Sequence, residues 1–197
     1  MKLTFSSDLT AAAWLTQSTT PADQLISFGP AGFEAYARLR FIPDPAWPGQ
    51  SESAADLPDN HASDIEQTRS ALHWLKRFTS TPDDCFFLIW EGYSDIELPP
   101  AAVAGALVDL PDRRYAMFHG SLDGLDDWEA DFGSGNPVAP PAFVWPADHR
   151  WCFTSDVDPH WAGIGAERAA VEVLAAASGL DVVRASPSED QSRYAYR

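Results

Sequence analysis

The clearest pattern in the chain is an alternation of apolar and polar residues over positions 33–41. The apolar members are Phe33, Ala35, Ala37, Leu39 and Phe41, and the residues between them are Glu34, Tyr36, Arg38 and Arg40. A period of two predicts a β-strand with one face in the core and one polar face. Arg38 and Arg40 are therefore expected side by side on the polar face.

Several other segments favour strands. Residues 85–90 (CFFLIW) are apolar without interruption, which is typical of a central strand covered on both faces. Residues 114–121, 142–145, 151–154 and 181–185 are short runs rich in aromatic or β-branched residues and read as further strands. Residues 25–28 (LISF) are a weaker candidate, ended by Gly29 and Pro30.

Two longer helices are predicted. The first covers residues 63–78 and opens with a capping box, Ser63 followed by Glu66. The second covers residues 159–178: Asp158 would cap it, Pro159 would occupy its first position, and Ser178-Gly179 would end it. Residues 150–185 would then form a strand, an acidic turn, a helix and a strand. A short helix is expected at residues 9–15.

This order of elements predicts an α+β fold in a single domain spanning residues 1–197. We expect a mostly antiparallel sheet of about five to seven strands packed by the two longer helices, because strands and helices do not alternate strictly as in a doubly wound fold. Residues 42–62, with Pro43, Pro45, Pro48 and Pro58, predict a long loop within this domain. Loops of that length are often lids or binding segments.

The charge balance narrows the classes of partner. The chain carries 29 Asp and Glu against 13 Lys and Arg, a formal net charge of −16, together with 8 Trp and 11 Phe. The aromatic content supports a real core and argues against disorder. The negative field disfavours nucleic acid and anionic membrane surfaces, and favours either solubility alone or a basic protein partner. The oligomeric state is left open.

Neither the cysteines nor the first residues of the chain indicate a functional site or a targeting signal. Cys85 and Cys152 each lie in a predicted strand without CxxC spacing, so we expect buried thiols rather than a disulfide or a zinc site. The first residues lack a basic stretch followed by a long apolar run, and no apolar run approaches membrane-spanning length. These features predict a cytoplasmic protein.

Charged and aromatic residues at predicted strand ends suggest a pocket at the rim of the sheet. The candidate residues are Arg38, Arg40, Glu91, Tyr93, His119, Asp156 and His160. The two arginines would hold a carboxylate or phosphate ligand, or pair with the protein's own acids. His119 is either a rim group or a partly buried, hydrogen-bonded histidine, and we favour the second.

The acidic turn at residues 156–160 has two interpretations. Asp156, Asp158 and His160 would share a face if the strand continued through them, which suits a metal or acid–base cluster. A helix starting at Pro159 breaks that alternation and makes Asp158 a cap, so we expect no metal site. The acidic segment 121–129 likewise lacks the spacing of a calcium loop.

Gly163 and Gly165 would lie in the first turns of the second helix, where exposed N–H groups favour an anion. The run HWAGIGA at residues 160–166 faintly resembles the pyrophosphate loop of acyl-CoA-dependent N-acetyltransferases, with His160 where those proteins have Gln or Arg. Only about twenty residues follow the helix, too few for the strands that close that fold. A close packing contact explains the glycines equally well, and we expect no cofactor.

Four segments resemble a family of uncharacterised actinobacterial proteins: FGPAGFEAYARLRF at 28–41, TPDDCFFLIWEG at 81–92, WPADHRWC at 145–152 and DVDPHW at 156–161. These segments are spread from residue 28 to residue 161, and the resemblance extends over most of the chain. The resemblance implies a cytoplasmic globular protein of unknown function and brings no activity, cofactor or site with it.

Two functions remain. The first is a non-enzymatic interaction protein that binds a basic partner, with Trp14, Trp47 and Trp128 as anchors if they are exposed. The charge, the aromatic content and the absence of Walker, G-x-S-x-G and H-E-x-x-H motifs favour it slightly. The second is a small-molecule enzyme or ligand binder with its pocket at the sheet rim. Convergence of at least three of the seven candidate residues would support the second.

Overall fold

The computed structural model describes residues 2–195 and shows one continuous nine-stranded sheet. Its strands are β1 (Thr4–Phe5), β2 (Ala35–Arg40), β3 (Cys85–Trp90), β4 (Val108–Leu110), β5 (Arg113–Gly120), β6 (Phe143–Pro146), β7 (Trp151–Thr154), β8 (Trp161–Ala166) and β9 (Val182–Ala185). The spatial order is β1-β5-β3-β6-β7-β8-β2-β9, with β4 paired to β5. Every pairing is antiparallel.

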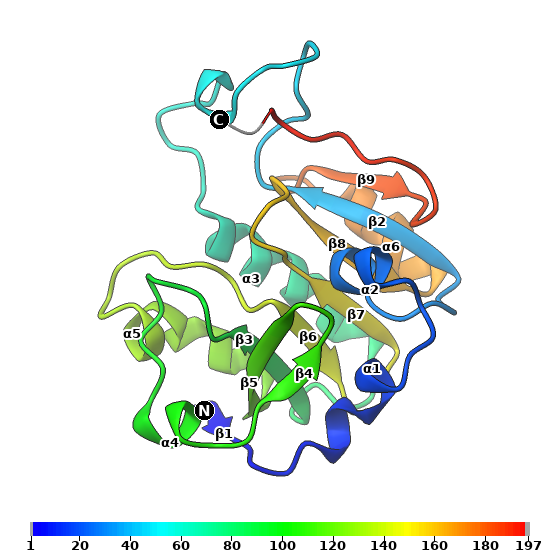
Figure 1. Cartoon of the computed structure of the whole chain (residues 1–197). Helices are drawn as coiled ribbons and strands as arrows, with labels where there is room; N and C mark the ends of the chain where they lie inside the picture. Colours follow the sequence, from blue (N-terminus) through cyan, green and yellow to red (C-terminus); the bar gives the residue numbers. More distant parts are fainter. Residues whose placement is uncertain (1, 196–197) are drawn as a thin grey trace.

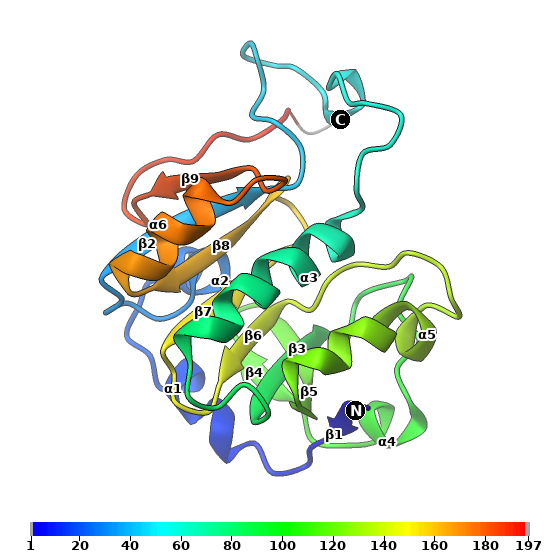
Figure 2. The ribbon, with the colours of Figure 1, turned by 180° about the vertical axis from the view of Figure 1, so that it is seen from behind.

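Helices cover both faces of this sheet (Figures 1 and 2). The α-helices are α1 (Ala13–Thr16), α2 (Ala22–Phe28), α3 (Asp64–Leu75), α4 (Pro100–Val103), α5 (Trp128–Phe132) and α6 (Arg168–Ala176), and the 3-10 helices are η1 (Thr10–Ala12), η2 (Glu52–Ala54), η3 (Lys76–Phe78) and η4 (Leu122–Asp127). Helices α3, α5 and α6 lie on the face turned toward the viewer in Figure 2, and α1 and α2 lie on the other. The fold is α+β, as the sequence predicted.

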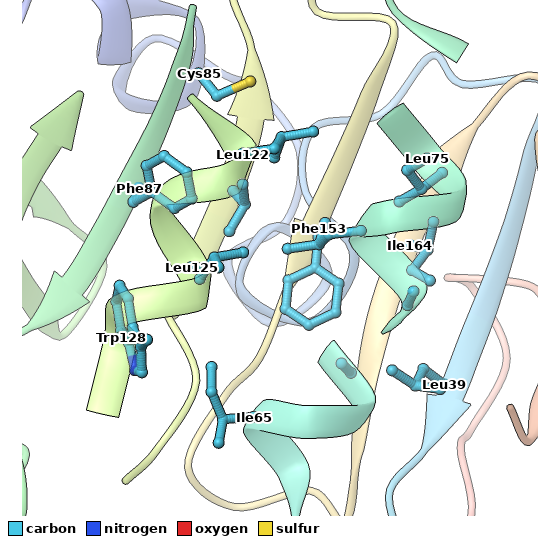
Figure 3. Packing of buried hydrophobic residues seen from close by; sticks show 14 of the residues in the cluster. Leu39, Ile65, Leu75, Cys85, Phe87, Leu122, Leu125, Trp128, Phe153 and Ile164 are labelled. Atoms are coloured by element: carbon cyan, nitrogen blue, oxygen red, sulfur yellow. The ribbon is translucent and has the colours of Figure 1, made fainter. Parts of the chain in front are cut away.

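The larger core lies between the sheet and the α3 side. Leu39 and Ile164 from neighbouring strands meet Ile65 and Leu75 of α3, and Phe153 of β7 lies beside them (Figure 3). All five side chains are almost fully buried. A second cluster on the α1–α2 side packs Leu15 and Leu25 against Trp145 and Cys152. Strands between two such layers must be apolar on both faces, which is why β3 is an uninterrupted apolar run.

The strongest local patterns of the sequence are confirmed. Alternation places Ala37 and Leu39 of β2 in the core. Helix α3 begins after a complete capping box, in which the Ser63 hydroxyl accepts from the Glu66 N–H and the Glu66 carboxylate accepts from the Ser63 N–H. Cys85 and Cys152 are free and buried.

The predicted strand number and the second long helix are wrong. The sheet has nine strands rather than five to seven. Residues 161–166, expected in a helix starting at Pro159, form the fully buried strand β8, and α6 begins only at Arg168. Residues 25–28, expected as a strand, belong to helix α2.

Close packing explains why residues 161–166 form a strand rather than the predicted helix. A Cβ added at Gly163 would stand 1.9 Å from the carbonyl oxygen of Ser27, so the end of α2 lies directly on the strand backbone. A second glycine, Gly165, leaves room for the ring of Phe33, whose nearest carbon would be 2.4 Å from an added Cβ. Glycine in a strand commonly marks such a close approach, and the sequence alone gives no sign of which partner approaches.

Candidate functional site

The site is built at one rim of the sheet, where β2, β3 and β7 end and where β5, β6 and β8 begin. Antiparallel pairing brings these ends together, with Trp90 opposite Tyr115 and Phe143 opposite Thr154. The loop that follows β2 and the β7–β8 turn at residues 155–160 extend beyond this rim. One pocket of the described chain lies at this rim.

Asp44, in the long loop, binds three of the candidate residues. Its carboxylate accepts two hydrogen bonds from Arg38, at 2.9 and 3.1 Å, one from Arg40 at 2.9 Å and one from His160 at 3.0 Å. Arg40 also binds Asp181 at 2.7 and 3.1 Å. Both guanidinium groups are thus engaged with the protein's own acids, which was the second of the two interpretations left open for them.

The protonation of this cluster follows from its contacts. Burial raises the pKa of Asp44, but the hydrogen bonds from Arg38, Arg40 and His160 outweigh it and lower the pKa to about 2. Burial lowers the pKa of His160 more than Asp44 raises it. A neutral His160 therefore donates from Nε2 to a charged Asp44 near neutral pH. The cluster holds the start of the loop against the sheet.

Beside this cluster lies a pocket of about 320 Å³ whose walls carry five carboxylates. They are Glu52, Asp64, Asp95, Asp156 and Asp158, and they come from four separate segments of the chain. Three of the seven candidate residues line this pocket: Asp156, already named among the carboxylates, Tyr93 and His160. We call this the acidic pocket.

Arg113, at the start of β5, is the cation closest to these carboxylates. It forms an ion pair with Asp156 and a weaker contact with Asp158 at 3.4 Å, and its guanidinium lies 4.9 Å from the ring centre of Trp90. The side chains of Glu52 and Asp64 form no ion pair with any residue between 2 and 195. The pocket therefore keeps a net negative charge.

Burial raises the pKa of two of these acids. Asp64 sits in the recess although part of its surface stays exposed; loss of water raises its pKa, and the charge of Glu52 raises it further. Burial also raises the pKa of Asp156, and Arg113 opposes that shift. In both cases loss of water is the largest cause, and nearby positive groups, His61 for Asp64 and Arg113 for Asp156, only partly oppose it.

Two hydroxyl groups complete the lining. Ser155 is only 3% exposed and its hydroxyl forms no hydrogen bond with residues 2–195. Its place directly after β7 puts it on the same side as Phe153, toward α3. Tyr93 packs edge-on against Trp90, with ring centres 5.5 Å apart, and burial followed by the charge of Asp156 raises the pKa of its hydroxyl.

The remaining candidates lie elsewhere. Glu91 pairs at the surface with Arg114, at 2.7 Å. His119 is at the opposite end of β5 from Arg113, about 20 Å away at the usual rise along a strand. It pairs with Asp84 at 2.6 Å, lies against Phe86, and its side chain is 45% exposed. The favoured interpretation of a partly buried histidine therefore overstated its burial.

The anion site expected at Gly163 and Gly165 has no structural basis. Both residues lie inside strand β8, where their N–H groups are part of the sheet and no helix begins. The close packing contact offered as the alternative explains both glycines.

A second pocket, of about 470 Å³, lies across Phe41 from the acidic pocket and is lined by residues of the loop and of the α6–β9 connection. Two of its polar side chains are already bonded: Arg40 binds two aspartates, and Gln67 binds the carbonyls of Phe41 and Ala62. Fewer carboxylates line it than line the acidic pocket. We therefore take the acidic pocket as the candidate site.

Most of the acidic pocket could not be identified from the sequence. Glu52, Asp64 and Asp95 lie in separate segments and were not among the candidate residues, and neither was Asp44. The one usable signal was the unusual length of the loop at 42–62, because this loop supplies both Asp44 and Glu52. Arg113 and Ser155 carried no signal at all.

Within the described residues, the groups of the acidic pocket form neither a set of metal ligands nor an activated serine. Among residues 2–195, no three of the His, Cys, Asp and Glu side chains stand close enough to hold a metal ion. No base is hydrogen-bonded to Ser155, so the pairing that activates a serine nucleophile is not formed. His160 is committed to Asp44 through Nε2.

The tryptophans contribute unequally to the surface. Trp128 is fully buried and cannot act as an anchor, Trp14 is half-buried and stacks on His149, and Trp47 on the loop is 55% exposed. Within residues 2–195, no helix is both long and apolar enough to traverse a bilayer.

The chain matches no known family model, no curated protein and no solved structure. The resemblance to uncharacterised actinobacterial proteins thus stays a prediction, and the function must be argued from the site itself.

Proposed function

We propose that this protein is a non-enzymatic, cytoplasmic binding protein that recognises a positively charged ligand through its acidic pocket. The observation that carries the proposal is the set of five carboxylates around one pocket of about 320 Å³, with Arg113 as their one ion-pair partner in the described chain. A cation that enters gains attraction from several carboxylates at once.

The overall charge of the chain also favours a positively charged ligand. A net charge of −16 attracts cations over distances near the Debye length and repels nucleic acid. A basic partner protein would meet the same field, and exposed Trp47 offers it an apolar contact. The alternative is a small-molecule enzyme or ligand binder that uses the same pocket at the sheet rim, and the convergence of Tyr93, Asp156 and His160 on the pocket supports a small-molecule ligand.

Calorimetric titration tests the proposal. Spermine, a tetra-lysine peptide and argininamide are titrated into the protein at 50 and 300 mM NaCl. We expect at least one of these cations to bind, with weaker affinity at the higher salt concentration. The double substitution Glu52→Gln with Asp95→Asn should weaken binding at least tenfold, because it removes two carboxylates from the pocket walls.

The matched control is Asp109→Asn with Glu172→Gln. It removes the same charge from exposed positions on β4 and α6 that do not line the pocket. This control should bind like the wild type. If no cation binds, or if both double variants lose affinity equally, the acidic pocket is not the recognition site.

A further inference from the structure

The charge of the acidic pocket is spread over its walls rather than focused on one point. Its carboxylates come from η2, from the start of α3, from the loop after β3 and from the β7–β8 turn. In the described residues no three metal-ligating side chains converge. A small inorganic cation would reach only part of this charge, whereas a ligand with several separated positive groups would reach more of it.

Apolar surface lies between the charged groups. Phe41 and Ile42 are buried at the rim of the sheet, Pro140 lies opposite, and Val157 is 41% exposed. This lining suits aliphatic segments between cationic groups, since methylene groups gain from leaving water. A volume of about 320 Å³ is at the lower end for small-molecule sites and fits a metabolite better than a folded peptide.

The Ser155 hydroxyl is an observation independent of the acids. The residue is only 3% exposed, it lines the pocket, and its hydroxyl forms no hydrogen bond with another residue between 2 and 195. A hydroxyl that lines a pocket and is not bonded within the described chain is available to a ligand that enters the pocket. A hydroxyl oxygen can accept a hydrogen bond from an ammonium N–H.

We propose that the acidic pocket binds a linear aliphatic polyamine in an extended conformation. One ammonium group donates to Ser155 and to the adjacent Asp156, and another reaches Glu52 or Asp95 across the pocket. The methylene chain lies along Ile42 and Val157. This inference rests on the proposed function and names the ligand class of the same site.

A primary ammonium fits this lining better than a guanidinium. An ammonium donates three hydrogen bonds in diverging directions, which matches acceptors that come from several walls. A guanidinium prefers a coplanar, bidentate carboxylate. Within the site, Asp156 already has an arginine partner in Arg113.

The experiment is a calorimetric series at constant ionic strength with butylamine, 1,4-diaminobutane, spermidine and spermine. We expect affinity to rise at least tenfold from butylamine to spermidine, because each added ammonium reaches a further carboxylate. Ser155→Ala should weaken spermidine binding roughly tenfold, since a hydrogen bond to a charged group is lost. Its melting temperature should stay unchanged, because the hydroxyl has no partner among residues 2–195.

The outcomes separate this inference from the proposed function. Equal affinity for butylamine and spermidine, or an unchanged affinity in Ser155→Ala, overturns the polyamine assignment. Binding of the tetra-lysine peptide or argininamide without spermidine binding also overturns it, while the cation-binding function stands. Absence of binding by every cation overturns both.

Discussion

Arg38 and Asp44 form a bidentate ion pair, with N–O distances of 2.9 and 3.1 Å, between strand β2 and the loop that lines the acidic pocket. Arg38 is only 8% exposed, so this carboxylate supplies the counter-charge that water cannot supply. The pair fixes the loop to the sheet. Because Glu52 belongs to the same loop, the pair also helps to position this part of the pocket wall.

Replacing Asp44 with Asn should destabilise the protein by about 2–3 kcal/mol, because a buried guanidinium loses its counter-charge. Urea unfolding at pH 7 measures this loss. The control Asp181→Asn removes a partner of Arg40 that is 42% exposed and should cost less than about 1 kcal/mol. Equal losses in the two variants would show that Asp44 has no special role.

The pH dependence of the same carboxylate follows from its pKa. Folding lowers the pKa of Asp44 from 3.8 to about 2, so the unfolded chain takes up a proton first as the pH falls. The stabilisation is therefore complete above about pH 4 and is lost between about pH 4 and pH 2. It amounts to roughly 2 kcal/mol at 1.36 kcal/mol per pH unit. The difference between wild type and Asp44→Asn should shrink over that range.

Gly163 should tolerate no side chain. An alanine there would place its Cβ 1.9 Å from the Ser27 carbonyl oxygen and 2.8 Å from Thr154 Oγ1, and backbone cannot give way cheaply. We expect a loss of about 3 kcal/mol or more, or no folded protein. Gly179→Ala is the control: its φ is +87° and its Cβ would meet nothing within 4 Å, so it should cost about 1 kcal/mol. Circular dichroism melting curves compare the two.

The two thiols should be inert in the folded protein. Burial, and then the charges of Asp84 and Asp148, raise the pKa of Cys85 to about 12, and burial alone raises the pKa of Cys152. Because the thiolate is the reactive form, a disulfide reagent at pH 8 should modify neither cysteine within an hour. In 6 M guanidinium chloride it should modify both cysteines of the chain. Rapid reaction of one thiol under native conditions would show that its strand opens locally.

The rim site was only partly accessible from the sequence. Arg38, Arg40 and His160 were marked, and they do meet, but at Asp44, which had no distinguishing neighbours in the sequence. Glu91 and His119 carried the same kind of signal and lie apart from the pocket. Residue type and position at a strand end thus identify candidates, whereas the strand order decides which of them share a rim.

The sequence by itself determined the α+β class, the strands β2 and β3, the capped start of α3 and the acidic charge of the surface. Each depends on local physics: a period of two, an uninterrupted apolar run, a Ser–Glu capping box and a count of ionisable groups. Only the tertiary structure decided that residues 161–166 form a strand, because the fit of Gly163 beneath Ser27 is a contact between segments more than a hundred residues apart. It likewise decided the acidic pocket, whose carboxylates are brought together by antiparallel pairing and by a loop held at Asp44. Such contacts depend on which surfaces pack together, and that information is distributed over the whole chain rather than written in any one segment.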